Sequence, residues 1–187
     1  MSTGIKNKAE LLLALLYAGG QDTKIEGITR LEKLLFLLKQ EKGFLANVNP
    51  ENDFKFFPFR MGPWTNEVYD EVDFLESLGL LSKETDAKST PADTASLDEL
   101  FDNMMLEKYQ KNVSSNDKGT EIFKLTKEGK EKALVIWNRL TVSEKNGIID
   151  LMQKFNKINL RQLLRYVYQK YPQYATESEI KDSLGLS

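Results

Sequence analysis

The sequence predicts a mainly α fold with a small β-wing, meaning a β-hairpin that projects from a helical body. One observation is the dense apolar run from Ile28 to Leu38, which has helical spacing and covers almost every side of its helix. A second is the short aromatic strand Phe54 to Phe59, followed by Gly62-Pro63-Trp64. A third is a pair of half-apolar segments, Leu80 to Lys83 and Glu121 to Leu125, which we expect to pair as strands.

Turn and capping residues predict where the first two helices begin and end. Ile5 to Tyr17 is expected to form an amphipathic first helix that ends at Gly19-Gly20. The segment up to Gly27 is interpreted as a linker. Thr29-Arg30-Leu31-Glu32 matches a capping box and opens a second helix, which runs to about Lys42 and stops at Gly43. Because this helix is apolar almost all round, it should be the central buried helix.

The third helix follows Pro63, with Thr65 as its candidate N-cap, and Gly79 closes it. Its apolar face consists of Val68, Val72, Leu75 and Leu78, with Tyr69 and Phe74 beside it. Its other face carries Glu67, Asp70, Glu71, Asp73 and Glu76. Trp64 is expected to pack against Phe57 or Phe59 as part of a structural turn.

A long polar insertion, Glu84 to Thr120, separates the two strands of the wing. Within it, Ser96-Leu97-Asp98-Glu99 matches a capping box and opens an amphipathic helix that carries Met104 and Met105. Lys111 to Gly119 is rich in Asn and Ser, which is typical of a loop.

Four further helices are predicted after the wing, each from a capping residue. Thr126 caps Lys127 to about Leu140, and the capping box Thr141-Val142-Ser143-Glu144 opens a helix to Phe155. Asn159 opens the next helix, which Pro172 ends. Thr176 to Gly185 is predicted to form a last short helix. Tyr168 and Tyr171 are expected to pack in the core.

Composition excludes many chemistries, because the 187 residues include no cysteine and no histidine. Disulfides, thiolate catalysis, Cys zinc sites, Ser-His-Asp triads and His metal sites are therefore impossible from this chain alone. We expect no cofactor, no metal and a cytoplasmic location. No run approaches the roughly 18 apolar residues that span a bilayer, so no membrane association is expected. Lys6, Lys8 and Leu11 to Leu16 superficially resemble a signal peptide, but the apolar run is short.

Charge is distributed unevenly along a chain whose net charge is −2. Residues 1–63 carry nine basic and seven acidic side chains, whereas residues 64–117 carry four basic and thirteen acidic ones. Residues 118–170 reverse this balance, with twelve basic and five acidic side chains. Such segregation can steer charged partners, although separated charged faces are also compatible with simple solvation.

Several segments of the chain resemble a known family. Arg30 to Leu38, followed by Phe57 to Pro63 and Glu67-Val68-Tyr69, resembles the Panacea domain, which includes SocA-like antitoxins and YwgA-like proteins. Phe123 to Gly129 is similar to the strand-to-helix step at the end of such a wing, and the similarity covers roughly residues 5–140. The resemblance implies a winged-helix-like fold and an antitoxin or regulatory role without catalytic residues. The long insertion departs from the family pattern.

We therefore predict a winged-helix-like domain at 1–140, with an insertion at 84–120, and a C-terminal helical extension at 141–187. The predicted function is that of a non-enzymatic, antitoxin-like regulator that binds a partner protein, such as a toxin, and a homodimer is left open. The third helix of a winged helix normally enters the DNA major groove. Here that helix is acidic, and phosphates repel carboxylates. Its Glu67, Asp70 and Glu71, together with Met104 and Met105, are the predicted protein-binding residues.

Two other hypotheses remain. In the first, the chain is a DNA-binding regulator that uses a basic later surface. That surface consists of Lys124, Lys127, Lys130, Lys132, Arg139, Lys154, Lys157, Arg161 and Arg165, the last four being the candidate contacts. In the second, Glu128-Gly129-Lys130 and Asp117 form a magnesium-dependent nuclease site, but these residues begin a helix and their carboxylates should not converge.

Overall fold

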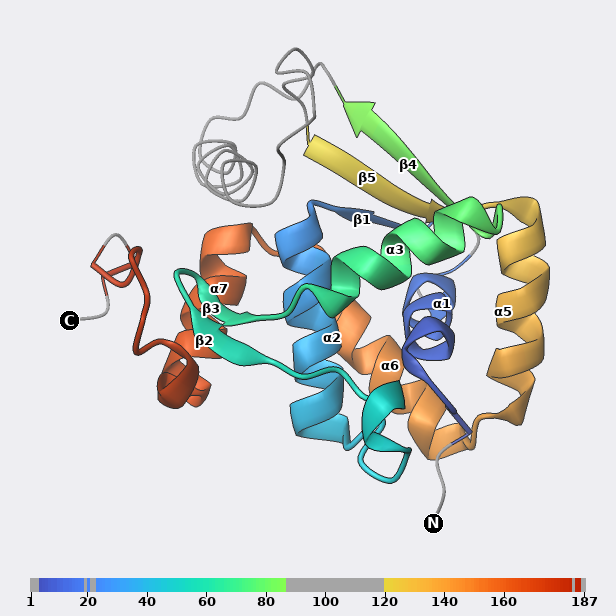
Figure 1. Ribbon diagram of the computed structural model, residues 1–187, viewed down its shortest axis with the longest axis horizontal. Coiled ribbons are helices and arrows are strands. Elements are labelled where there is room, and N and C mark those ends of the chain that lie inside the picture. Colours follow the sequence, from blue (N-terminus) through green and yellow to red (C-terminus); the bar gives the residue numbers. More distant parts are fainter. Residues whose placement is uncertain (1–3, 19, 21–22, 87–119, 183, 186–187) are drawn as a thin grey trace.

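The structure is a computed structural model that describes residues 4–18, 20, 23–86, 120–182 and 184–185. Over these residues the chain is mainly helical, with six α-helices and two small antiparallel sheets (Figure 1). The helices are α1 (Lys8–Ala18), α2 (Ile28–Lys42), α3 (Glu67–Ser77), α5 (Lys127–Arg139), α6 (Val142–Phe155) and α7 (Leu160–Lys170). The strands are β1 (Lys24–Glu26), β2 (Phe57–Phe59), β3 (Gly62–Trp64), β4 (Leu81–Asp86) and β5 (Thr120–Leu125). The prediction of a mainly α fold with small antiparallel sheets is confirmed.

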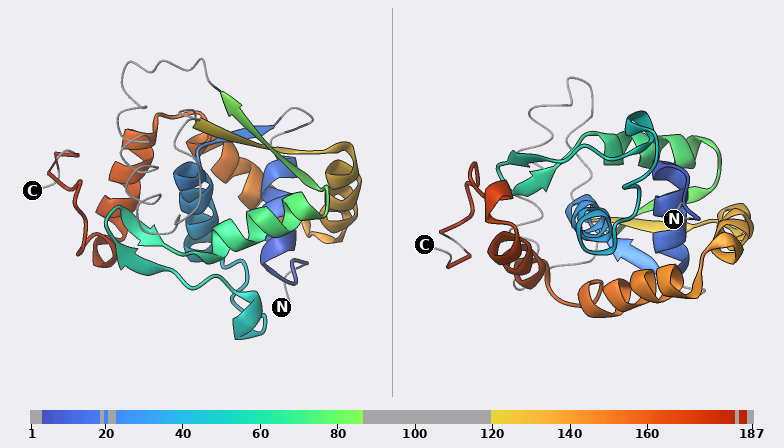
Figure 2. Two further views of the ribbon diagram at one scale, coloured as in Figure 1. Left: turned by 45° about the horizontal axis from the view of Figure 1, so that its top comes forward. Right: turned by 90° about the horizontal axis from the view of Figure 1, so that it is seen from below.

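Helix α2 is the centre of the molecule, as its apolar sequence predicts. Every residue from Leu31 to Leu38 is buried, and α1, α6, α7 and the β2–β3 hairpin all pack around the helix. Seen from below, α3 and α6 lie on opposite sides of the body with α2 between them, and α5 and α7 close the two flanks (Figure 2). One hydrophobic core includes Leu35 on α2, Ile136 on α5 and Leu164 on α7. The C-terminal extension therefore shares its core with the first 140 residues.

The larger sheet has the strand order β1-β5-β4. Strands β4 and β5 pair from Leu81 opposite Leu125 to Asp86 opposite Thr120, which confirms the predicted pairing. Strand β1 pairs with β5 through Ile25 opposite Phe123, so the prediction of a linker before α2 was wrong for these residues. Buried Ile25 explains the strand, because its side chain joins the core.

Several predicted helix ends are confirmed by hydrogen bonds. The hydroxyl of Thr126 accepts from the amide of Gly129, and Asn159 accepts from Gln162. Thr141 and Glu144 form the complete capping box at the start of α6. Gly43 ends α2 at a φ of 67°, a left-handed conformation that glycine adopts without strain.

Other local predictions differ from the structure. Helix α1 begins at Lys8 rather than Ile5, and the aromatic strand is only Phe57–Phe59. The capping box predicted at Thr29–Glu32 was wrong, because Gly27 is the N-cap and the Glu32 side chain is buried in other contacts. Residues 175–182 and 184–185 form turns, so the described part of the chain has no helix there.

The third helix and its aromatic surroundings follow the prediction with two differences. Asn66 occupies the N-cap position of α3, although the Thr65 hydroxyl accepts from the amide of Glu67 at 3.3 Å. Leu78 was predicted to be buried but is 54% exposed. Trp64 packs on Phe59 with 5.1 Å between ring centroids, as expected. Tyr168 is buried, and Tyr171 packs edge-on against Phe36.

Candidate partner-binding surfaces

The start of α3 is fixed to the central helix by a buried ion pair. Lys33 and Glu32 on α2 lie 2.6 Å apart, with side chains that are 1% and 4% exposed. The Lys33 ammonium also donates to the carbonyl of Pro63 at 2.7 Å, and Glu32 accepts from the amide of Thr65 at 2.8 Å. Burial raises the pKa of Glu32, and the contacts with Lys33 and the Thr65 amide oppose that rise. The pair therefore positions β3 and Thr65, which lies two residues before α3.

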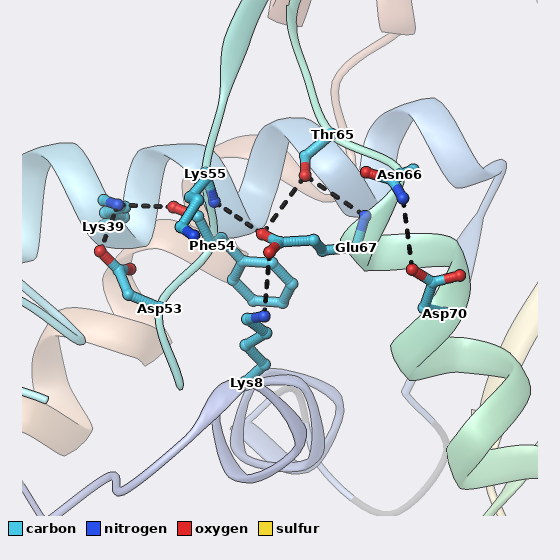
Figure 3. Close-up of polar contacts among 9 residues, drawn as sticks. All are labelled: Lys8, Lys39, Asp53, Phe54, Lys55, Thr65, Asn66, Glu67 and Asp70. Carbon is cyan, nitrogen blue, oxygen red and sulfur yellow. Dashed lines mark hydrogen bonds and ion pairs between the residues drawn. The ribbon is translucent and has the colours of Figure 1, made fainter. Parts of the chain in front are cut away.

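Glu67, one of the predicted partner-binding residues, is instead the centre of an internal network (Figure 3). One carboxylate oxygen pairs with Lys8 of α1 at 3.0 Å, and the other accepts from the amide of Lys55 at 2.7 Å. The hydroxyl of Thr65 lies 3.4 Å from the second oxygen. These contacts join α1, the segment before β2 and α3, so Glu67 has little capacity left for a partner.

Asp70 is more available than Glu67, whereas Glu71 is partly enclosed and its Oε2 atom is buried. Asp70 is exposed, and its contact in Figure 3 is a long one of 3.4 Å from the side-chain amide of Asn66. Glu71 is half-buried, and its Oε2 atom has no hydrogen-bond partner among the described residues. Burial raises the pKa of the Glu71 carboxyl, the charge of Lys8 opposes that rise, and Asp70 and Glu67 add to it.

The C-terminal half of α3 faces the β4–β5 hairpin through a second charged group. Lys83 on β4 pairs with Asp73 at 2.8 Å and with Glu76 at 2.7 Å. Desolvation raises the pKa of Glu121 on β5, which also interacts electrostatically with Lys83, Asp73 and Glu76. Three carboxylates therefore share one ammonium group where α3 meets β4 and β5.

Two large apolar side chains are exposed beside these carboxylates. Phe74 is 51% exposed and Leu78 is 54% exposed. The sequence interpretation placed both with the buried face of α3 and so missed them as surface residues. Their spacing gives the signal, because Asp70, Phe74 and Leu78 are each four residues apart and form a row beside the face of buried Val68, Val72 and Leu75 rather than within it. Met104 and Met105, the other predicted contacts, lie outside the described residues.

The four candidate contacts of the alternative basic surface lie on α6, on α7 and in the connection between them. Lys157, Arg161 and Arg165 are exposed there. The Lys154 ammonium lies 4.8 Å from the ring centroid of Phe155 and 4.7 Å from that of Tyr166, so it is held against aromatic rings. Two other members of the proposed basic surface are neutralised: Lys124 pairs with Glu84 and Arg139 with Glu10.

The arrangement of the described residues does not support the third hypothesis, a magnesium-dependent nuclease site. Glu128 lies exposed in the first turn of α5, and Asp117 lies outside the described residues. In the part of the chain that the structure describes, no three acidic, His or Cys side chains gather in a way that fits a metal ion. None of the described helices is long and apolar enough to cross a membrane.

Comparisons of the chain with protein-family models, with curated proteins and with solved structures found no match. Function must therefore be argued from the surfaces themselves.

Proposed function

We propose that this chain is a non-enzymatic, antitoxin-like regulator with a winged-helix-like fold, which acts by binding a partner protein through α3. The order of elements supports the fold assignment: α1, β1, α2 and α3 are followed by the β4–β5 hairpin, and β1 adds to the β5 side of that hairpin. This is the order of a winged helix, with the β2–β3 hairpin inserted before the third helix. The resemblance of Arg30 to Leu38 and Phe57 to Pro63 to the Panacea domain agrees with it.

The observation that carries the proposal is the surface of α3. The helix contains five carboxylates and no basic residue, and it exposes Phe74 and Leu78. A DNA-reading helix needs Lys and Arg to neutralise phosphates, so an acidic helix in that position repels DNA. Exposed apolar side chains surrounded by charged ones are instead typical of a protein contact surface.

Coexpression tests this function. The chain is expressed together with the product of the adjacent reading frame, and host growth is measured when that product alone is toxic. We expect the chain to restore growth, and we expect the Asp70→Lys/Phe74→Ser variant to lose this effect. Asp150→Lys, an exposed carboxylate on α6 across the body from α3, is the matched control and should still restore growth. A neighbouring product that is harmless, or toxicity that the chain leaves unchanged, contradicts the antitoxin role.

A second candidate function is DNA binding through the basic C-terminal surface, which the exposure of Lys157, Arg161 and Arg165 favours. Retention on heparin and on duplex DNA at two salt concentrations tests it, because phosphate contacts weaken steeply with salt. Under our proposal retention is weak. Strong, salt-sensitive retention that the Arg161→Glu/Arg165→Glu variant abolishes would favour the DNA-binding alternative.

A further inference from the structure

We propose that the outer face of α3, which we define as Asp70, Asp73, Phe74, Ser77 and Leu78, binds a cationic amphipathic segment of the partner. Apolar side chains of that segment cover Phe74 and Leu78, while its Lys and Arg side chains meet the carboxylates. This inference rests on the proposed function and adds the chemistry of the partner to it.

The apolar part of the surface is compact. Phe74 and Leu78 are four residues apart, which places their side chains next to one another on one side of the helix. About half of each side chain is open to solvent. Covering two such side chains removes apolar area from water, and buried anchors of this kind contribute most of the energy of many protein interfaces.

The charge around this apolar pair determines the class of partner. Six carboxylates interact across α3 and its neighbours, namely Glu67, Asp70, Glu71, Asp73, Glu76 and Glu121. Among the described residues, two ammonium groups, those of Lys8 and Lys83, form ion pairs with them. Four negative charges remain uncompensated in this group. A cationic segment would supply the missing charge, and the attraction would also increase its rate of association.

The same charge argues against other occupants of the face. A symmetric dimer through α3 would place the uncompensated negative charge of one copy against that of the other, since a twofold interface brings identical patches together. Like charges juxtaposed in this way are costly. Nucleic acid is repelled for the same reason. An amphipathic helix or strand with Lys and Arg beside its apolar side chains satisfies both the apolar pair and the carboxylates.

Peptide binding to the full chain tests the inference. The probe is a fluorescein-labelled peptide of 15 residues that contains only Leu and Lys, with Leu at helical i, i+4 positions. We expect binding that weakens with salt, and we expect Phe74→Ser and Asp70→Lys each to weaken it about tenfold, which corresponds to about 1.4 kcal/mol. Phe57→Ser on β2, where the side chain is 54% exposed, and Asp150→Lys on α6 are the matched controls and should leave binding within about twofold. Circular dichroism melting of each variant confirms that the fold is kept.

Two further peptides separate the apolar contribution from simple charge attraction. A Lys/Ser peptide of the same charge should bind at least about tenfold more weakly, and a Leu/Glu peptide should not bind. Equal binding of the Lys/Ser peptide, or wild-type binding by Phe74→Ser, overturns the inference. A dimer of the free chain that is observed in sedimentation and lost in the Phe74→Ser variant would also overturn the inference, because the occupant of the face would then be a second copy. Peptide binding through α3 without growth rescue refutes the antitoxin role alone, whereas rescue without such binding refutes only this inference.

Discussion

Charged side chains are buried where α3 begins but exposed along its outer side. At its start, Glu32 and Lys33 of α2 lie almost completely buried, and they contact each other and the backbone of Pro63 and Thr65. Along its outer side, the carboxylate of Asp73 is 71% exposed even though it pairs with Lys83. The first arrangement fixes the position of α3, whereas the second leaves charge available to solvent and to a partner.

This difference indicates which charges can change without loss of the fold. Removing one member of a buried pair leaves an uncompensated charge in the interior, which is expensive. An exposed ion pair is screened by water and salt and contributes little to stability. Architecture should therefore depend on the α2 pair and recognition on the α3 surface. Substitutions at the two places should therefore differ in their effect on stability.

The largest effect is expected from Lys33→Met. It leaves the Glu32 carboxylate buried beside an apolar side chain and removes the hydrogen bond to the Pro63 carbonyl. The free energy of unfolding should fall by about 3–5 kcal/mol, the usual cost of breaking a buried pair. Urea denaturation at pH 7 measures this change.

The double variant Glu32→Met/Lys33→Met is the control for that experiment. It removes both charges but also the acceptor of the Thr65 amide, so one backbone amide loses its partner at a cost of about 1–3 kcal/mol. The double variant should therefore be more stable than Lys33→Met alone. If it is less stable, the hydrogen bond from the Thr65 amide to Glu32 outweighs the cost of burying an unpaired carboxylate, and the buried charge is then not what makes Lys33→Met destabilising.

Sequence alone predicted those elements whose signals are local. Thr126, Thr141 and Asn159 cap α5, α6 and α7 because each side chain reaches the amide three residues further along the chain. The apolar run of α2 predicted a central buried helix because only a buried helix can be apolar on every side. The pairing of β4 with β5 followed from two matched half-apolar segments.

Features set by distant contacts could not be predicted in this way. The pattern Thr29–Glu32 reads as a capping box, yet Glu32 contacts Lys33 and the Thr65 amide, which lies 33 positions away in sequence. Likewise, Glu67 was grouped with the free carboxylates of α3, but Lys8 and the Lys55 amide occupy its oxygens. Which carboxylates of an acidic helix are already paired depends on the tertiary fold.

A smaller effect, of opposite sign, is expected from Glu71→Gln. Burial raises the pKa of the Glu71 carboxyl above its ordinary value of 4.5, so the folded protein binds this proton more tightly than the unfolded chain does. Stability is therefore lost as the pH rises through 4.5 toward the raised pKa. Glutamine removes that loss, so the variant should be more stable than the wild type at pH 7 and should lose this advantage below pH 4.5. The gain should stay below about 1 kcal/mol, because the side chain is only half-buried.

Thermal melting of both proteins at several pH values measures the Glu71 effect. Asp150→Asn, which alters an exposed carboxylate on α6, is the control and should melt like the wild type at every pH. An advantage of Glu71→Gln that is largest at acid pH would show that the ionised carboxylate stabilises the fold.

The smallest effect on stability is expected from Lys83→Met, which removes the ammonium shared by Asp73 and Glu76. These pairs are partly exposed, so the free energy of unfolding should change by no more than about 1 kcal/mol. The same substitution raises the uncompensated charge around α3 from four to five, because Lys83 is one of the two cations there. Binding of the Leu/Lys peptide should therefore strengthen at low salt, and the gain should disappear at about 1 M salt, where the screening length falls to about 3 Å. Weaker peptide binding would mean that Lys83 positions the carboxylates for the partner, and the separation between architecture and recognition would then not hold at this end of α3.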